Sequence, residues 1–253
     1  MSNPLVSCLC CTYNRKEPLE EAIQCFIDQG YKNKELIILN DQEGVTLKLD
    51  NSFNNIQIVN YPTRFNSLGE KRNYLNTLAN GEYICVWDDD DLYIPFRISQ
   101  SVQGFKNKPD VDIVKQKYAL MSVNNSNYKL VRNLFHSQAC ITKEYINKTQ
   151  YIHKSVGEDI EFEKNARIHS IDIRPFVAYV YRWGGKNIHH LSGIADEKRS
   201  WAAGKEKALK EFSGKKEIIL KPQFYNNYWK DIEQFWFGVN KEYAKMWKNQ
   251  INY

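Results

Sequence analysis

Apolar residues form short runs along the first 115 positions, and the segments between those runs carry apolar residues at helical spacing. Continuous apolar runs are typical of strands that are buried on both faces of a parallel sheet. They predict strands over Leu5–Cys11, Glu35–Leu39, Ile56–Val59 and Tyr83–Trp87. Helices are predicted from Pro18 to Gly30 and over Glu70–Asn80, because Pro suits a first helical turn and Gly a helix end. The alternation predicts an α/β fold with parallel strands and right-handed crossovers.

The pattern changes after about position 110. Short β-like runs are predicted at Val111–Val114, Tyr118–Val123 and Lys129–Val131, a helix over Gly157–His169, and a late strand over Phe176–Tyr181. The last 58 residues hold 12 of the 34 aromatic residues, interleaved with lysines, and are predicted to be helical. Because there is no internal repeat and no low-complexity linker, we expect one domain at residues 1–195 and a C-terminal helical extension at residues 196–253.

Composition excludes several classes of protein. Of 253 residues, 42% are hydrophobic and 26% are charged, which is typical of a globular chain and excludes wholesale disorder. No apolar run approaches the roughly 18 residues that span a bilayer, and the N-terminus lacks the layout of a signal peptide, so we expect a soluble intracellular protein. Six cysteines without a CxxC pair are expected to be buried, reduced thiols. The net charge of +5 lies mostly in the extension and leaves a polyanionic partner open.

Polar clusters follow three of the predicted strands directly. Thr12–Arg15 follows the first strand, Asn40–Asp41 the second, and Asp88–Asp91 the fourth. In open parallel sheets, ligands bind beyond the carboxyl ends of the strands. We therefore expect the three clusters to form one site.

The run Asp88–Asp91 is the strongest local signal. Four adjacent carboxylates repel one another, so placing them at the end of a buried strand is costly unless a cation compensates. Mg²⁺ and Mn²⁺ prefer oxygen ligands, which predicts a divalent metal site here. The alternative is a solvated acidic turn in which Asp91 caps a helix.

Two basic or mixed clusters are weaker signals. Thr12, Tyr13 and Arg15 offer a hydroxyl, an aromatic ring and a cation that suit a base or sugar and a phosphate, although an ordinary polar loop would look the same. Lys71 and Arg72 lie in the first turn of a predicted helix, where cations oppose the helix dipole. A bound anion would explain their position, and a solvated basic turn is the alternative.

Two later clusters have equally open interpretations. Glu158 and Asp159 begin a predicted helix, where acidic residues commonly complement the dipole, but a carboxylate directed into a cleft would serve as a general base. His189 and His190 follow a paired-glycine loop. Adjacent side chains point in different directions, so we expect at most one of the two to be a ligand, and a structural role is the alternative.

In this order, the clusters resemble those of the family 2 glycosyltransferases, which have the nucleotide-sugar-binding GT-A fold. The resemblance rests on VSCLCCTYNR, ELIILND, LGEKRNYLNTLANGEYICVWDDDDLYIP and GEDIEF, and covers about residues 4–190. It implies a Rossmann-like, mostly parallel sheet flanked by helices, with a nucleotide-sugar-binding half at residues 1–115 and an acceptor and catalytic half at residues 116–195. The extension has no counterpart in the resemblance. Asn40 stands where the family usually has an acidic residue.

The resemblance also implies residue roles. Thr12, Tyr13 and Arg15 would line the nucleotide pocket, Asp41 would bind the base, and Lys71 and Arg72 would lie near the nucleotide or its phosphates. Asp88 or Asp89 would contact the ribose or donor sugar. Asp90, with Asp88, would hold the metal, and His189 or His190 would add a metal or phosphate contact. Asp159 would be the general base, with Glu158 as its neighbour. Because four aspartates are adjacent, this register can shift by one residue.

The implied activity is inverting, Mn²⁺- or Mg²⁺-dependent transfer from a nucleoside-diphosphate sugar, expected to be UDP-linked, to an acceptor hydroxyl in glycan or polysaccharide synthesis. Other hypotheses are transfer to a modified nucleic-acid base, a metal-dependent nucleotidyltransferase or phosphohydrolase, and a nucleotide-sugar-binding protein without turnover. The acceptor remains open between a glycan, a lipid-linked sugar, a protein and a modified DNA base. The aromatic extension is expected to pack on the domain, to form a homodimer, or to contact the inner membrane face of an otherwise cytoplasmic protein.

Overall fold

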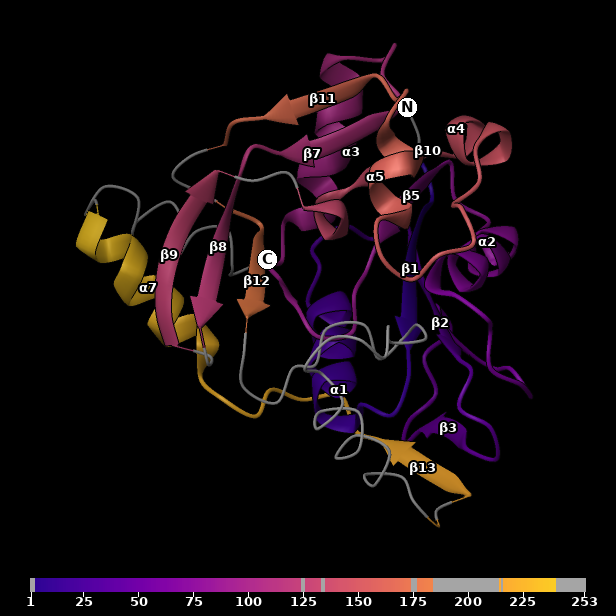
Figure 1. Cartoon of the computed structure of the whole chain (residues 1–253). Coiled ribbons are helices and arrows are strands. Elements are labelled where there is room, and N and C mark those ends of the chain that lie inside the picture. Colours follow the sequence, from indigo (N-terminus) through magenta and orange to yellow (C-terminus); the bar gives the residue numbers. More distant parts are fainter. Residues whose placement is uncertain are drawn as a thin grey trace.

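The computed structural model describes residues 3–123, 126–132, 135–173, 177–183, 214 and 216–239. A seven-stranded sheet forms its centre, in the order β11-β7-β10-β5-β1-β2-β4 (Figure 1). Its strands are β1 (Val6–Thr12), β2 (Lys34–Asn40), β4 (Ile56–Asn60), β5 (Tyr83–Val86), β7 (Ile113–Gln116), β10 (Cys140–Thr142) and β11 (Ile168–Ile171). Only β10 runs antiparallel to its neighbours in this sheet. The predicted α/β fold with a mostly parallel sheet is confirmed.

Smaller sheets and helices complete the fold. A second sheet has the order β6-β12-β8-β9, and a two-stranded sheet joins β13 to β3 in parallel. These strands are β3 (Thr46–Leu49), β6 (Leu92–Tyr93), β8 (Tyr118–Val123), β9 (Ser126–Arg132), β12 (Tyr179–Trp183) and β13 (Glu217–Leu220). The helices are α1 (Lys16–Ile27), α2 (Leu68–Leu78), α3 (Arg97–Asn107), the 3₁₀ turn η1 (His136–Gln138), α4 (Lys143–Lys148), α5 (Glu158–Glu163) and α7 (Tyr228–Val239).

The hydrophobic core lies on both faces of the central sheet. Cys8 and Cys10 of β1 join a cluster that includes the apolar face of α1, whereas Leu9 and Cys11 join a second cluster that includes Leu75 of α2. Successive side chains of a strand point to opposite faces, which is why the sequence run divides in this way. All six cysteines are free and buried, as predicted. Among the described residues, no helix combines the length and the apolar character needed to span a bilayer.

Two sequence predictions about later elements are wrong in part. The helix expected over Gly157–His169 ends at Glu163, and Ile168–Ile171 form β11, which pairs in parallel with β7. β11 obtains its hydrogen bonds from a strand more than 50 positions earlier, and local periodicity does not contain that information. The extension was predicted to be helical throughout, but its described part contains the strand β13 as well as α7. Phe176, the predicted start of the late strand, lies outside the described residues.

Candidate active site

The carboxyl ends of β1 and β5 and the start of α5 surround a cavity of about 190 Å³. The predicted residues that line it are Arg15, Arg72, Asp88, Asp89, Asp90, Glu158 and Asp159. Thr12, Tyr13, Asp41 and Lys71 lie outside its lining. His189 and His190 lie outside the described residues. Residues separated by more than 140 positions therefore meet in one cavity, whereas the Asn40–Asp41 cluster, which was expected to join the same site, does not line it.

Arginine side chains compensate the charge of the aspartate run. Nη1 of Arg15 lies 2.6 Å from Oδ1 of Asp89 and 2.7 Å from Oδ2 of Asp90. Nη2 of Arg72 lies 3.4 Å from Oδ1 of Asp88, whose side chain is 30% exposed. Asp88 is therefore the most accessible member of the three that face the cavity. Burial raises the pKa of Asp89 to about 6 although Arg15 opposes that shift.

Asp91 has a different environment. Its carboxylate accepts hydrogen bonds from the Tyr179 hydroxyl (2.5 Å) and from the backbone N–H of Arg182 (2.9 Å). The Arg182 side chain donates to the backbone carbonyl of Asp90. Burial raises the pKa of Asp91 well above its ordinary value. Asp91 is therefore part of the support of the cavity, and it does not cap a helix, because α3 begins six residues later.

The residues at the end of β5 fit a hard divalent cation. They offer carboxylate oxygens, and Oδ2 of Asp89 is buried without a hydrogen bond from the described residues. The described residues contain no group of three or more His, Cys, Asp or Glu side chains arranged to hold a metal. Mg²⁺ commonly takes one or two carboxylates and completes its shell with water and substrate phosphates. The donor set therefore suits a cation that is bound together with a phosphorylated ligand.

Lys71 and Asp41 form a buried ion pair next to the carboxyl ends of β1 and β2. Nζ of Lys71 lies 2.6 Å from Oδ1 of Asp41 and donates to the carbonyl of Thr12 at the same distance. Oδ2 of Asp41 accepts a hydrogen bond from the backbone N–H of Phe65 (3.1 Å). The anion that explains Lys71 in the first turn of α2 is therefore Asp41 in this structure. Ser67 caps that helix by accepting from the N–H of Glu70 (3.2 Å).

The loops after β1 and β2 have defined local structure. The guanidinium of Arg64 lies 3.5 Å from the centre of the Tyr13 ring. Asn40 stands where the glycosyltransferases that the chain resembles usually have an acidic residue. Its side-chain amide donates hydrogen bonds to the Val45 carbonyl and to Oδ1 of Asn60, each at 3.0 Å. A carboxylate cannot donate these hydrogen bonds, so the amide at position 40 fits the turn that follows β2.

Glu158 and Asp159 take separate positions at the start of α5. Gly157 precedes them with φ of +78°, a left-handed conformation that favours glycine. The Glu158 carboxylate is buried 3.6 Å from Nε of Arg72, and burial raises its pKa. Asp159 is half-buried and lines the cavity. Glu158 therefore contacts Arg72, and Asp159 is the carboxylate available to a ligand.

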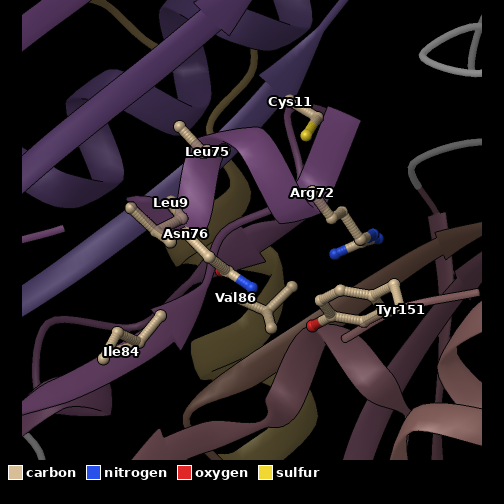
Figure 2. A pocket seen from close by; sticks show the side chains of 8 residues that line it. All are labelled: Leu9, Cys11, Arg72, Leu75, Asn76, Ile84, Val86 and Tyr151. Carbon is tan, nitrogen blue, oxygen red and sulfur yellow. The ribbon is translucent and has the colours of Figure 1, made fainter. Parts of the chain in front are cut away.

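Two further residues, His136 in the cavity lining and Tyr151 beside it, support the site, although no sequence pattern predicts either of them. His136 of η1 lines the cavity and hydrogen bonds to the Tyr151 hydroxyl (2.9 Å). The Arg72 guanidinium lies 5.7 Å from the centre of the Tyr151 ring. Figure 2 shows Arg72 and Tyr151 at one end of a separate, small pocket of about 10 Å³, which is lined also by Leu75 and Val86. A lone histidine in a polar loop has no spacing that distinguishes it from a structural residue.

Comparisons with known proteins agree on the sequence family. The model of glycosyl transferase family 2 matches residues 7–160. Protein CgeD of Bacillus subtilis is 29% identical over 136 residues, which cover 47% of this chain and 30% of CgeD. The amylovoran biosynthesis glycosyltransferase AmsB of Erwinia amylovora is 28% identical over 97 residues, which cover 36% of this chain and 32% of AmsB. The chain thus spans about a third of the length of these relatives.

Solved structures share the fold. TarS 1–349 of S. aureus in complex with UDP-GlcNAc superposes with a TM-score of 0.57 and 13% identity, over 82% of this chain and 66% of that chain. The mannosyltransferase PcManGT of Pyrobaculum calidifontis in complex with GDP-Man and Mn²⁺ gives a TM-score of 0.53 and 14% identity, over 80% of this chain and 60% of that chain. At these identities the likeness establishes the architecture of the sheet and helices.

Proposed function

Because the chain belongs to glycosyl transferase family 2, we propose that it transfers a sugar from a nucleoside-diphosphate sugar to an acceptor hydroxyl. The observation that carries this proposal is the meeting of Asp88, Asp89 and Asp90 with Asp159 across one cavity. Of the first three, Asp88 and Asp90 would hold a divalent cation that balances the charge of the departing diphosphate, and Asp159 would remove a proton from the acceptor hydroxyl.

The donor side of the site is proposed to lie at the ends of β1 and β5. Arg15 and Arg72 line the cavity and attract a diphosphate. Tyr13 and Thr12 follow β1 and would contact the nucleoside, and Asp41, held by Lys71, would lie near the base. The solved relatives contain UDP-GlcNAc in one case and GDP-Man in the other, which supports a nucleotide-sugar donor. We expect a UDP-linked sugar.

Asp90 and Asp88 are proposed to hold Mn²⁺ or Mg²⁺, with Asp89 contacting the ribose or sugar. The structure with GDP-Man and Mn²⁺ supports a divalent cation in this fold. Such a cation supplies positive charge that stabilises the departing diphosphate. Arg15 holds Asp89 and Asp90 in the same place through its two ion pairs, so the chain itself limits repulsion between these carboxylates. His189 and His190 remain candidates for a further contact.

Asp159 is proposed to accept the proton of the acceptor hydroxyl as that oxygen attacks the anomeric carbon. The new bond joins the acceptor oxygen to this carbon, and the bond from the carbon to the phosphate oxygen breaks with its electron pair leaving on the diphosphate. A single displacement inverts the anomeric centre, as in inverting glycosidases. Glu158 neighbours the base and, through Arg72, links it to the donor side.

The acceptor is proposed to be a glycan in polysaccharide synthesis, which the similarity to AmsB, a glycosyltransferase of amylovoran biosynthesis, supports. A lipid-linked sugar, a protein and a modified DNA base are the other acceptor classes to be tested. We also propose that the protein is cytoplasmic. The extension is proposed to form a homodimer or to contact the membrane.

A donor screen tests the proposed function. The purified chain is incubated with UDP-linked and GDP-linked sugars, with Mn²⁺, Mg²⁺ or EDTA, and the free nucleotide and the sugar product are quantified. We expect release of nucleoside diphosphate with one donor class, slow with water and faster with a glycan acceptor, and lost in EDTA. Release of nucleoside monophosphate with a sugar phosphate would instead identify phosphoryl chemistry. Donor binding without release under every condition would identify a binding protein.

A further inference from the structure

Helix α5 carries the proposed base but is too short to hold its own position. It contains six residues, and isolated helices shorter than about 12 residues are marginal in water. Its start follows the left-handed Gly157, and Ile160 is 71% exposed, so this end has little apolar packing. The position of Asp159 must therefore depend on contacts made elsewhere on the helix.

The opposite end of α5 is fixed by a cluster of buried polar side chains. Oε2 of Glu163 lies 2.5 Å from Nζ of Lys115, which is 1% exposed in the centre of β7. Oε1 of Glu163 lies 2.5 Å from Nδ1 of His136, whose side chain is 6% exposed. Burial by itself would raise the pKa of Glu163, but His136 and Lys115 outweigh burial and hold that pKa below its ordinary value. Glu163 is therefore a carboxylate with two basic partners on two other elements.

The same cluster continues to the donor side of the cavity. A carboxylate only accepts hydrogen bonds, so Nδ1 of His136 donates to Glu163, and Nε2 of the same ring forms a hydrogen bond with the Tyr151 hydroxyl at 2.9 Å. Tyr151 stacks on Phe162 of α5 with ring centres 4.0 Å apart. Its ring also faces Arg72, which pairs with Glu158. One continuous set of contacts therefore joins Glu163 at the end of α5 to Glu158 at its start, through His136, Tyr151 and Arg72.

We infer that Glu163, held by Lys115 and His136, is a positioning residue that fixes α5 so that Asp159 faces the cavity. Asp159 lies four positions before Glu163, which is about one helical turn, so a shift at Glu163 is transmitted directly to Asp159. The two bonds of the Glu163 side chain itself join Lys115 and His136, and neither of these partners lies on β1 or β2. The inference rests on the proposed function only for the role of Asp159 as base.

The test compares Glu163→Gln with Glu161→Gln on the same helix. Glu161 is exposed and, among the residues that the structure describes, its carboxylate pairs only with the exposed Lys164 at 3.5 Å, so it is a matched control for loss of one charge. For Glu163→Gln we expect faster amide hydrogen exchange over residues 158–163, unchanged affinity for UDP with Mn²⁺, and a kcat for transfer that falls about 10- to 100-fold. The donor KM should stay within about twofold of the wild-type value, and Glu161→Gln should match the wild type in all four measurements.

Two outcomes would overturn the inference. Unchanged exchange in α5 would show that Glu163 does not anchor the helix, and faster exchange with a wild-type kcat would show that the anchor does not position the base. If Glu163→Gln does not fold, as judged by loss of UDP binding and of the circular dichroism spectrum, His136→Asn carries the same comparison. If the wild type transfers no sugar from any donor, the proposed function fails, and the exchange measurement still decides whether the anchor exists.

Discussion

Four adjacent aspartates at the end of β5 have different environments, and these differences separate their roles. Asp88 is partly open to the cavity, Asp89 and Asp90 share the Arg15 guanidinium, and Asp91 is buried against Tyr179. A buried carboxylate stays ionised when a cation or several hydrogen-bond donors compensate its charge, whereas burial without such partners favours its protonated form. Ligand chemistry is therefore expected from Asp88 to Asp90 and structural support from Asp91.

The variant Arg15→Met tests whether Arg15 compensates the negative charges of Asp89 and Asp90. Removing one partner of a buried ion pair commonly costs about 3–5 kcal/mol, because the remaining charge keeps its desolvation cost, so we expect the free energy of unfolding to fall by about 3 kcal/mol. Mn²⁺ should raise the thermal midpoint of the variant more than that of the wild type, because a cation held by Asp90 and Asp88 would replace part of the positive charge that Arg15 supplies.

The matched control is Lys48→Met. Lys48 pairs with Glu217 on the surface, where both side chains are at least half exposed, and such a pair contributes about 0–1 kcal/mol. Equal destabilisation of the two variants, measured by urea unfolding, would contradict the account of the aspartate run. An identical response of both variants to Mn²⁺ would contradict the proposed metal site.

Several residues that line the cavity were predictable from the sequence. The ion-pair and hydrogen-bond partners of the site residues were not. Arg15, Asp88 to Asp90 and Asp159 were recognisable because they follow predicted strands or begin a predicted helix. The pairing of Lys71 with Asp41 was not, because the two residues are 30 positions apart and meet only when β2 and α2 pack together. His136 gave no signal, since its role depends on Glu163 and Tyr151 in other elements.

At the scale of elements, the start of α2 packs closely against the segment before α5. The N–H of Gly69 donates to the Lys154 carbonyl at 3.0 Å, and a Cβ at position 69 would lie 1.9 Å from the Ile152 carbonyl oxygen. No side chain fits there without backbone movement. Gly69 therefore permits the approach of the two segments that carry Arg72 and Asp159.

Gly69→Ala should lower the free energy of unfolding by about 1–3 kcal/mol, since overpacking against backbone forces the two segments apart. Gly30→Ala is the control, because the nearest atom to its added Cβ would be the Pro95 carbonyl oxygen at 3.8 Å, an ordinary contact. Chemical denaturation of both variants makes the comparison. A Gly69→Ala variant as stable as the control would show that this packing is looser than described.

Lys34 joins the start of β2 to the end of α1, where its Nζ donates to the carbonyls of Gln29 and Ile27. Burial lowers its pKa to about 8. Because the folded-state pKa lies below the unfolded value, the unfolded chain binds more protons between these two values, and stability rises with pH across that window. From pH 7 to pH 10, the wild type should gain roughly 2 kcal/mol relative to Lys34→Met. A constant difference in urea unfolding at pH 7, 8, 9 and 10 would exclude this effect.

Elements with strong local patterns were predictable, and elements defined by distant partners were not. The runs that became β1, β2, β4 and β5 are apolar and bounded by polar residues, so periodicity located them within a few residues. β11 and β13 are edge strands with half-exposed faces, and each pairs with a strand far away in the sequence. Their pattern alone does not distinguish a strand from a short helix.

At the scale of the molecule, the described part of the extension packs into the main core. Ile218, Leu220, Tyr228 and Ile232 belong to the same buried cluster as the apolar face of α1. The buried carboxylates of Glu20 and Glu21 on α1 accept hydrogen bonds from Lys221, Tyr225 and Tyr228. β13 lies beside β3, and α7 beside β9 (Figure 1). The predicted boundary at residue 195 remains a prediction, but side chains between residues 218 and 232 belong to the main hydrophobic core and are expected to stabilise it.

Ile218→Ala and Ile219→Ala test this contribution on neighbouring residues of β13. Ile218 is 4% exposed and Ile219 is 38% exposed, because they point to opposite faces of the strand. Removing the buried side chain should cost about 2–4 kcal/mol in the free energy of unfolding, and removing the exposed one less than about 1 kcal/mol. Equal and small losses for both would mean that the extension packs only loosely.

We propose that sugar transfer takes place in this cavity, with Asp159 as the base. The most direct measurement is the rate of transfer from the donor selected in the screen by the wild type and by Asp159→Asn, together with UDP affinity for both proteins. We expect kcat to fall at least about 100-fold because the amide cannot accept the acceptor proton, while UDP binds both proteins equally. Transfer by Asp159→Asn at the wild-type rate, with UDP affinity unchanged, would contradict the account.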